Sequence, residues 1–443
     1  MLRTERCTEI FYTKISRVNK FTERSQKLLI NISLSFSSDI LHIYWRSDLF
    51  GSSNLFFLNL KNRGEKMNEN KVKNNKKQID FILLVDVLLM LAVGIVMVMS
   101  ASSPTSLSET GNSYKYLKTQ AFSAVVGLGL MFFVSCIPYK MYKSFYKIIY
   151  ISVIILLLSV AVVGKSVSGA TRWIDLGFIS FQPSEVAKIG LIIFYASLLT
   201  KNKNKMGELI GGFIVPFLPL IPVIGILIGV QNHLSATILI VMIVSVMMLM
   251  AGSKLKYFLS VGLAGAGGLG GLLMLRAKLT GAGSFRLQRL ITFMNPFADK
   301  QGSGWQIIQS LYAIGSGGLF GVGLGKSTQK YLYLPEAHND FIFSIIAEEL
   351  GFIGCVVVIA MFAVFIWRGI IIAMKSPDMF SSLIAAGITT MVGLQAIINI
   401  AVVTSSMPNT GMPLPFFSYG GTSLLILLAS VGILLNISRY AKK

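Results

Sequence analysis

The stretch that decides the fold reads KYLYLPEAHNDFIF over residues 330–343 and continues without a break into a long apolar segment. It holds Pro335, Glu336, His338 and Asp340 within six residues, immediately before that segment. Asp340 is therefore expected where a water-facing loop meets the hydrocarbon of a membrane. A carboxylate at this depth costs free energy, so it is by default a candidate functional residue. We expect the rest of the chain to build a membrane scaffold around Asp340 or to supply positive charge near it.

The composition is that of a multi-span membrane protein. The 443 residues are 53% hydrophobic and only 13% charged, a balance that excludes a soluble domain of this length. The formal net charge is +21, but much of it lies in short runs between apolar segments, which is typical of topology determinants and of contacts with anionic lipid. We therefore expect membrane lipid, and no nucleic acid, beside these cations. Cys7, Cys136 and Cys355 share no motif and predict neither a disulfide framework nor a metal cluster.

Residues 1–66 do not resemble the rest of the chain, and they lack both a signal-peptide pattern and a clean span. Met67 opens a run that is typical of a cytoplasmic start, and residues 63–66 just before it can be encoded by an unbroken purine run, as a ribosome-binding site would be. We expect residues 1–66 to be a non-native extension, the alternative being a disordered basic arm. Residues 67–443 are expected to form one membrane domain.

From Ile79 onward, apolar segments near the length that a bilayer requires follow one another. They predict an all-α integral membrane protein with about ten transmembrane helices, at 79–100, 117–137, 145–163, 184–200, 209–229, 233–251, 256–276, 340–367, 380–404 and 420–438. With the N-terminus inside, the inner loops carry 17 Lys and Arg residues and the short outer loops carry four, so both termini are expected in the cytoplasm. The one long loop, about 277–339 between helices 7 and 8, is then extracytoplasmic. Chemistry at Asp340 would proceed where no nucleotide is present.

Two further interpretations of Asp340 follow from its neighbours. An acid after a Pro-containing loop and before an apolar run also fits a helix N-cap. Glu336, His338 and Asp340 alternate, so an extended chain would point all three side chains the same way. This set lacks the soft ligands that zinc prefers, and a hard divalent cation, Mg²⁺ or Mn²⁺, held by Asp340 and Glu336 and shared with a phosphate is the favoured metal hypothesis.

The long loop also carries candidate phosphate-binding cations. Arg286 and Arg289 are three residues apart and would share one face of a helix, which suits either a phosphate or lipid headgroups. The Gly-rich run 315–326, which ends in Lys326, does not match a nucleotide phosphate loop. It predicts close backbone packing near a ligand instead.

Polar residues inside apolar segments need partners. Glu185 and Lys188 open the fourth span at a spacing that allows them to pair across one turn, either as a structural pair or at a polar cavity. Asp86 in the first span raises the same question without a visible partner. Residues 408–423, which include Ser418, predict a rigid, re-entrant-looking loop that must be covered by protein or face a water-filled cavity.

From about Ile79 to Arg439 the chain resembles the SEDS family (shape, elongation, division and sporulation proteins: FtsW, RodA and SpoVE), and most closely its FtsW/SpoVE branch. Five ordered blocks carry the resemblance: residues 169–174, which include Arg172, 182–188, 305–310, 335–343, and 399 with 408–423. Residues 231–235 depart from the family pattern, and we assign them no role.

The resemblance implies ten helices and a peptidoglycan glycosyltransferase that polymerises lipid II outside the membrane, for septal or spore cell-wall synthesis. It also implies a class B penicillin-binding protein and other division or sporulation proteins as partners. The catalytic acid of the family motif corresponds to Asp340. An α-linked donor and a β-linked product imply an inverting displacement, for which Asp340 could serve as general base, while cations would stabilise the departing pyrophosphate.

The candidate substrate-binding residues combine these arguments and are Arg286, Arg289, Lys326, Arg172, Glu185, Lys188, His338 and Ser418. The alternative function is a lipid II flippase, which would need the same cavity and cations but no base. An ordinary secondary transporter would show internal inverted repeats, and the sequence has no convincing repeat.

Overall fold

The computed structural model describes residues 78–167, 170–175, 180–259, 293, 296 and 304–441, all within one compact unit, Lys77–Lys443. This part of the chain is mostly helical, as the sequence predicts. Eight of its helices are long and apolar enough to cross a membrane, and Leu234–Met250 is a shorter apolar helix. Most of the predicted span 256–276, residues 1–66, Arg286 and Arg289 lie outside the described residues. The count of ten helices and the position of the long loop therefore stay predictions.

The elements follow the chain as a series of helices interrupted by one small sheet. They are α3 (Phe81–Thr110), α4 (Lys115–Cys136), α5 (Lys140–Ser144), α6 (Tyr146–Val163), β1 (Gly164–Val167), β2 (Ala170–Asp175), β3 (Ser180–Phe181), α7 (Pro183–Lys201), η2 (Lys203–Lys205), η3 (Ile210–Ile214), α8 (Val215–Phe217), α9 (Leu220–Gly229), α10 (Leu234–Met250), α13 (Trp305–Gly317), α14 (Ile342–Lys375), α15 (Met379–Val403) and α16 (Gly421–Ser438).

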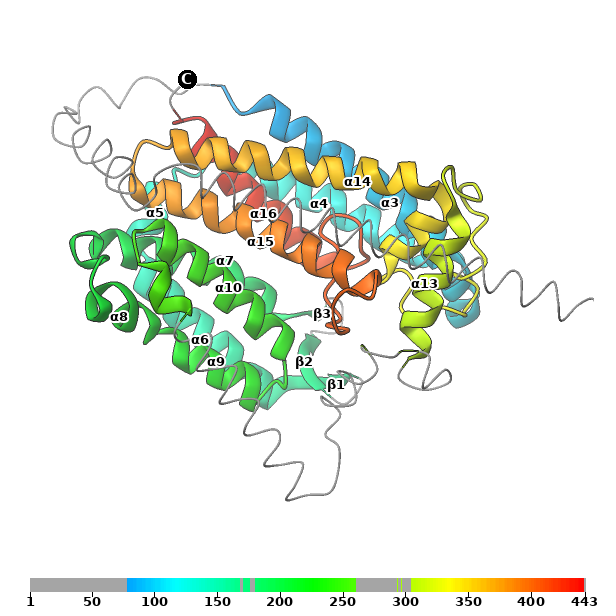
Figure 1. Ribbon diagram of the computed structural model, residues 1–443, viewed down its shortest axis with the longest axis horizontal. Coiled ribbons are helices and arrows are strands. Elements are labelled where there is room, and N and C mark those ends of the chain that lie inside the picture. Colours follow the sequence, from blue (N-terminus) through cyan, green and yellow to red (C-terminus); the bar gives the residue numbers. More distant parts are fainter. Residues whose placement is uncertain are drawn as a thin grey trace, which may run out of the picture. The chain divides into compact units, whose positions relative to one another are not determined.

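Two groups of helices make up the bundle. Helices α3, α4, α14, α15 and α16 run side by side, and α6, α7, α9 and α10 form a second group that meets the first where α7 and α10 pack on α15 (Figure 1). In α7 and α15, 72% of the apolar window is buried inside the protein, against 17% in α6. Lipid tails are as apolar as leucine, so this burial reflects close packing between helices rather than removal of apolar surface from water. The two most enclosed helices are therefore α7 and α15.

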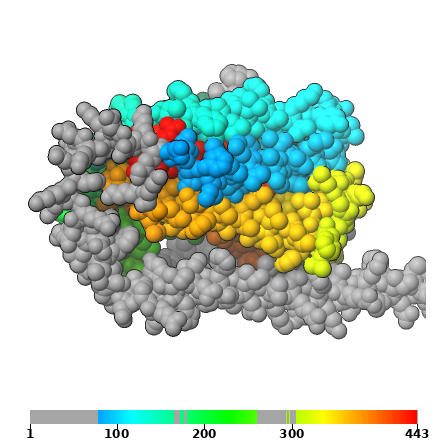
Figure 2. Space-filling view, turned by 90° about the horizontal axis from the view of Figure 1, so that it is seen from above, coloured from blue at the N-terminus to red at the C-terminus, as the bar shows by residue number. Residues whose placement is uncertain are grey.

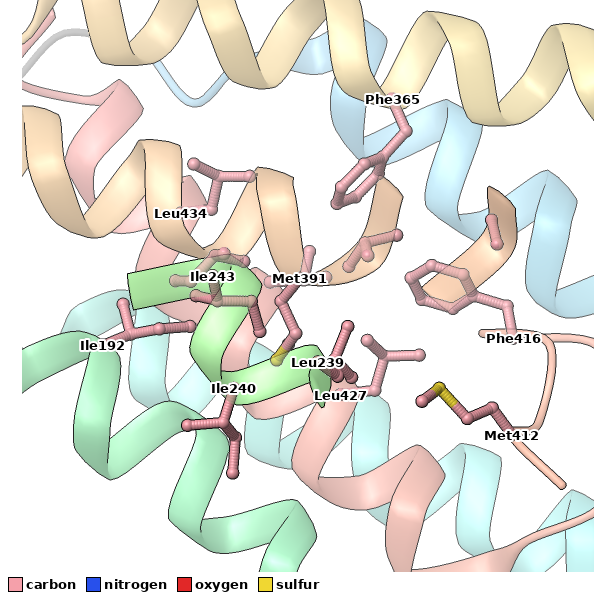
Figure 3. Close-up of a cluster of buried hydrophobic side chains, with 14 of the residues drawn as sticks. Ile192, Leu239, Ile240, Ile243, Phe365, Met391, Met412, Phe416, Leu427 and Leu434 are labelled. Carbon is pink, nitrogen blue, oxygen red and sulfur yellow. The ribbon is translucent and has the colours of Figure 1, made fainter. Parts of the chain in front are cut away.

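The core lies where these central helices meet. Ile192 of α7, Ile243 of α10, Met391 of α15 and Leu434 of α16 are all buried. Figure 3 shows them with Met412 and Phe416, which come from the irregular segment before α16. This segment therefore enters the core of the bundle, in keeping with the re-entrant loop predicted from its sequence.

A three-stranded antiparallel sheet joins α6 to α7, and an entirely helical prediction does not include it. Ile174 of β2 pairs with Gly164 of β1 and with Phe181 of β3. The side chain of Ile174 is buried, so it holds the sheet against the helices. The strands are far shorter than a transmembrane β-strand. Figure 1 shows them toward the end of the molecule where α13 lies, away from α5 and α8.

Two other elements add detail that the sequence prediction lacks. The predicted span 209–229 is confirmed as one apolar segment long enough to cross a membrane, Ile210–Gly229, but it is irregular within: η3, α8 and α9 follow one another, with Pro216 in α8 and Pro219 at the N-cap of α9. Proline removes a backbone donor and clashes with the preceding turn, which explains these irregularities. The predicted long loop contains a helix, α13. Figure 2 shows α3 and α14 side by side on one face, with residues of the 305–335 segment at one end of the pair.

Candidate active site

Asp340 is half-buried and lies two residues before α14. A residue of α15 binds its backbone. The side-chain amide of Asn399 donates to the carbonyl oxygens of Asp340 and Met412, both at 2.7 Å. Phe341 and Ile342, which follow Asp340, are completely buried. Phe341 occupies the N-cap position of α14, so the N-cap assignment for Asp340 is wrong by one residue. The sequence does not predict this role for Asn399, although an amide inside an apolar span is the signal that points to it.

The segment before α16 forms the other wall of the site. A Cβ atom built on Gly411 would lie 3.6 Å from Oδ2 of Asp340, so the Asp340 carboxylate faces this segment. The Ser418 hydroxyl donates to the carbonyl of Asn339 at 2.6 Å and accepts from the backbone N–H of Leu414 at 2.7 Å. Ser418 therefore ties the two walls together beside Asp340, and its hydroxyl is already used by the protein.

The far edge of this wall is fixed by α13 and α10. Asn409 donates to the side chain of Gln306 at 2.9 Å, and Gln306 donates to the carbonyl of Pro335 at 3.2 Å. The Ser235 hydroxyl of α10 donates to the carbonyl of Thr410 at 2.7 Å. Side chains from separate helices thus satisfy the polar backbone of an irregular segment, which a non-polar surrounding requires.

His338 lies in an aromatic cluster and not beside a metal-binding acid. Its ring is buried, with its centroid 4.9 Å from that of Tyr116 and 5.8 Å from that of Tyr419. The backbone N–H of Tyr419 donates to the carbonyl of His338 at 2.9 Å. Burial lowers the pKa of His338 below its ordinary value of 6.5, although Glu336 and Glu109 act in the opposite direction. The ring is therefore held neutral.

The predicted alignment of Glu336, His338 and Asp340 on one side of an extended chain is wrong. Glu336 has φ of +55° and starts a turn in which Phe341 N–H donates to the Glu336 carbonyl. The Glu336 side chain is exposed and accepts from the amide of Asn339. Within the described residues, no three His, Cys, Asp or Glu side chains gather as metal ligands. A cation held by Asp340, Glu336 and a phosphate stays a prediction.

Glu185 and Lys188 form the ion pair that their spacing predicts, at 2.8 Å on α7. The Lys188 side chain is buried, and Glu185 lines a cavity of about 30 Å³ together with Gln395 and Ser418. A volume of this size holds about one water molecule. Because Ser418 borders both this cavity and Asn339, the pair lies behind the wall that faces Asp340.

The other predicted cations divide into two kinds. Arg172 on β2 donates to the backbone carbonyls of Gln231 and Asn232, the latter at 2.8 Å, so it supports the segment before α10. Lys326 is exposed on the Gly-rich turn.

The buried acid of the first span also keeps its open question. In the described part of the chain, Asp86 of α3 is buried and its Oδ2 has no hydrogen-bond partner.

The structure contains a second polar cluster that the sequence did not predict. Glu348 and Glu349 of α14 are both about 1% exposed and bind residues 327–330. Two adjacent acids inside an apolar run were the signal that could have found it, because buried charges need partners.

Fold and site together define a multi-pass membrane protein in which a half-buried acid is enclosed by two irregular loops at one end of a helical bundle. A family model described as "Cell cycle protein", covering FtsW, RodA and SpoVE, matches residues 81–443. The chain belongs to this family.

Known proteins similar to the chain agree with this assignment. It is 40% identical to the stage V sporulation protein E of Bacillus subtilis (strain 168), covering 83% of this chain and 99% of that protein. It is 39% identical to the probable peptidoglycan glycosyltransferase FtsW of Geobacter sp. (strain M18), covering 81% and 96%.

Solved structures share the fold. One, described as "Structural coordination of polymerization and crosslinking by a peptidoglycan synthase complex", matches with a TM-score of 0.66 and 29% identity over 82% of this chain and 99% of that one. The rod shape determining protein RodA of Thermus thermophilus matches with a TM-score of 0.60 and 28% identity, over 82% and 98%.

Proposed function

We propose that this protein is a peptidoglycan glycosyltransferase that polymerises lipid II at the outer face of the bacterial cytoplasmic membrane, for septal or spore cell-wall synthesis. The name of the Geobacter relative supports the activity, and the name of the Bacillus subtilis relative supports a role in sporulation. The observation that carries the proposal is Asp340, a half-buried acid whose backbone is held by Asn399 and whose carboxylate faces Gly411.

The charge distribution supports an outward-facing site. Asp340 precedes α14, whereas Arg368 and Lys375 lie in the last third of that helix. Arg439 follows the end of α16, and basic residues 140–147 and 201–205 lie between predicted spans on the same side. The positive-inside rule then puts these ends and both termini in the cytoplasm and Asp340 outside.

The reaction would be an inverting displacement at the anomeric carbon of the donor. The acceptor hydroxyl oxygen forms the new bond to this carbon, the bond to the pyrophosphate oxygen breaks, and the hydroxyl proton passes to the Asp340 carboxylate. A positioned general base contributes about 10²–10⁴ in rate. The leaving group departs as polyprenyl diphosphate, for which Arg286, Arg289 and Lys326 are the proposed cations.

The remaining polar residues would act around this centre. We assign Glu185 and Lys188 to the polar floor behind Ser418, and Arg172 to support of the segment before α10. A class B penicillin-binding protein is the proposed partner, together with other division or sporulation proteins. The structural similarity to a chain from a peptidoglycan synthase complex supports assembly with a second protein.

The decisive experiment compares Asp340→Asn with the wild-type protein, each purified with its transpeptidase partner. Lipid II polymerisation is measured on gels, and lipid II transfer between leaflets is measured in vesicles. We expect the variant to bind lipid II but to lose polymerisation. Normal polymerisation by the variant would exclude the general-base role. Leaflet transfer by a wild-type protein that does not polymerise would support the flippase.

A further inference from the structure

The loop that carries Asp340 is closed at its base by a buried ionic cluster. Lys330 precedes Asp340 by ten residues and Glu349 follows it by nine. The ammonium of Lys330 lies 2.9 Å from Oε1 of Glu349, and these side chains are 4% and 0% exposed. The two ends of the Asp340 loop thus meet in one ion pair that is closed to solvent.

Hydroxyl groups complete this cluster and connect it to a neighbouring helix. The Ser100 hydroxyl of α3 donates to Glu349 at 2.7 Å and accepts from Lys330 at 3.1 Å. Glu348 accepts from the Ser327 hydroxyl at 2.5 Å and from both the N–H and the hydroxyl of Thr328 at 2.9 Å. Both carboxylates are therefore compensated by donors from the start of the loop.

The backbone around the cluster is equally constrained. Gly351 has φ of +68° and interrupts α14 two residues after Glu349. Val322 and Gly323 N–H groups donate to the carbonyls of Glu348 and Glu349, at 2.9 and 3.1 Å, and Phe352 N–H donates to the Gly318 carbonyl at 2.9 Å. The first part of α14, which begins two residues after Asp340, is therefore anchored at its far end.

A buried ion pair is a poor source of stability, because desolvation of the charges offsets their attraction. Apolar residues of similar size would often stabilise the fold as well. The cluster instead provides directional hydrogen bonds, because each carboxylate oxygen accepts from a defined donor. Such networks favour one geometry over its alternatives.

We infer that Lys330, Glu348 and Glu349 are positioning residues for Asp340: they lock both ends of its loop so that the carboxylate is held against the segment around Gly411. This inference rests on the proposed function. A displacement of about 1 Å at a reacting group can cost roughly 10²-fold in rate, so small shifts at the loop base are expected to matter at Asp340.

A matched control exists at the opposite end of the same two helices. Arg368 of α14 forms an ion pair with Asp80, the N-cap of α3, and that pair is also largely buried. It lies far along α14 from Asp340 and encloses no loop. Loss of either pair should lower stability, but only loss of the Lys330–Glu349 pair should alter catalysis.

The test uses the full-length protein in complex with its transpeptidase partner. For Lys330→Met and for Glu349→Gln, kcat, KM for lipid II, the rate–pH profile and thermal unfolding are measured. We expect kcat to fall about 10–100-fold, with KM within about threefold of wild type and an altered acidic limb of the pH profile. For Arg368→Met we expect a lower Tm and an unchanged kcat and pH profile.

If the charge variants do not fold, substitutions of Thr328 test the positioning role with a smaller change. Thr328→Val removes one hydroxyl donor to Glu348, and Thr328→Ser restores it. We expect the valine variant to lose activity and the serine variant to recover it. Folded Thr328→Val and Lys330→Met proteins with wild-type kcat would overturn the inference. Loss of activity in Asp340→Asn alone would then leave the proposed function standing without the positioning role.

Discussion

The two ends of the α3–α14 pair use the same kinds of residue for different purposes. At the Asp80 end, Asp80 accepts from the N–H of Leu83 and binds Arg368, and it thereby caps a regular helix. At the Asp340 end, Glu349 and Lys330 hold irregular chain instead of capping a helix. Asp340 belongs to that held chain and does not occupy the cap position of α14. At one end of the bundle an acid, Asp80, completes a helix. At the opposite end the acids Glu348 and Glu349 hold the loop that carries Asp340.

The largest expected difference between the two ends concerns their acids. Asp340→Asn keeps the size of the side chain but cannot accept the proton, so kcat should fall by about 10²–10⁴. Asp80→Asn keeps an N-cap residue and should leave kcat unchanged. Lipid II polymerisation by the two purified variants measures this contrast. Equal loss in both would mean that the acids act through stability rather than chemistry.

The second comparison stays at the Asp340 end and uses two glycines of similar backbone conformation, one packed against α14 and one after the last residue of α3. Gly321 has φ of +77°, and a Cβ there would lie 2.1 Å from the carbonyl oxygen of Glu349, whereas Gly111, with φ of +69°, faces open space. Gly321→Ala should therefore push residues 318–323 away from the break in α14 and abolish activity. Gly111→Ala should cost only the strain of a left-handed residue, about 1 kcal/mol. Thermal unfolding and polymerisation assays separate the two variants, and similar behaviour would show that the contact between Gly321 and Glu349 is not tight.

Substitutions at the Asp80 end should change stability alone. Asp378 caps α15 by accepting from Ser381 N–H at 2.8 Å, and it also accepts from the Tyr139 hydroxyl at 2.8 Å. Asp378→Ala should destabilise the protein by about 1 kcal/mol without a change in kcat. Chemical or thermal unfolding in detergent provides the first value and the polymerisation assay the second. A fall in kcat at full stability would contradict the separation between the two ends.

The sequence predicts those features that depend on short spacings. The change from a polar loop to an apolar run placed Asp340 at a helix start, and a separation of three residues predicted the Glu185–Lys188 pair. The positive φ of Glu336 could not be foreseen, and it turned an expected row of ligands into a tight turn.

Features that depend on distant contacts were not predictable in the same way. Glu349 meets Ser100, which is 249 residues away, and the Gly-rich run packs against a break at Gly351 that no local pattern indicates. Close packing of the glycines was predicted, but its partner was not. In physical terms, hydropathy and helical period determine which elements form. The packing of these elements then decides which buried polar groups meet.

The smallest expected effect concerns pH and His338, which lies on the Asp340 loop with its ring beside Tyr116 and Tyr419. Burial lowers its pKa below 6.5, so the folded protein holds the neutral ring, while the unfolded chain takes up a proton near 6.5. Its contribution to stability is therefore constant above about pH 6.5 and falls as the pH drops from there toward the lower folded pKa. His338→Phe keeps an aromatic ring between Tyr116 and Tyr419 but cannot be protonated, so its Tm should fall less between pH 7 and pH 5 than that of the wild type. An identical pH dependence of Tm in both proteins would mean that His338 is accessible to protons in the folded state, and that the wall beside Asp340 is looser than its contacts indicate.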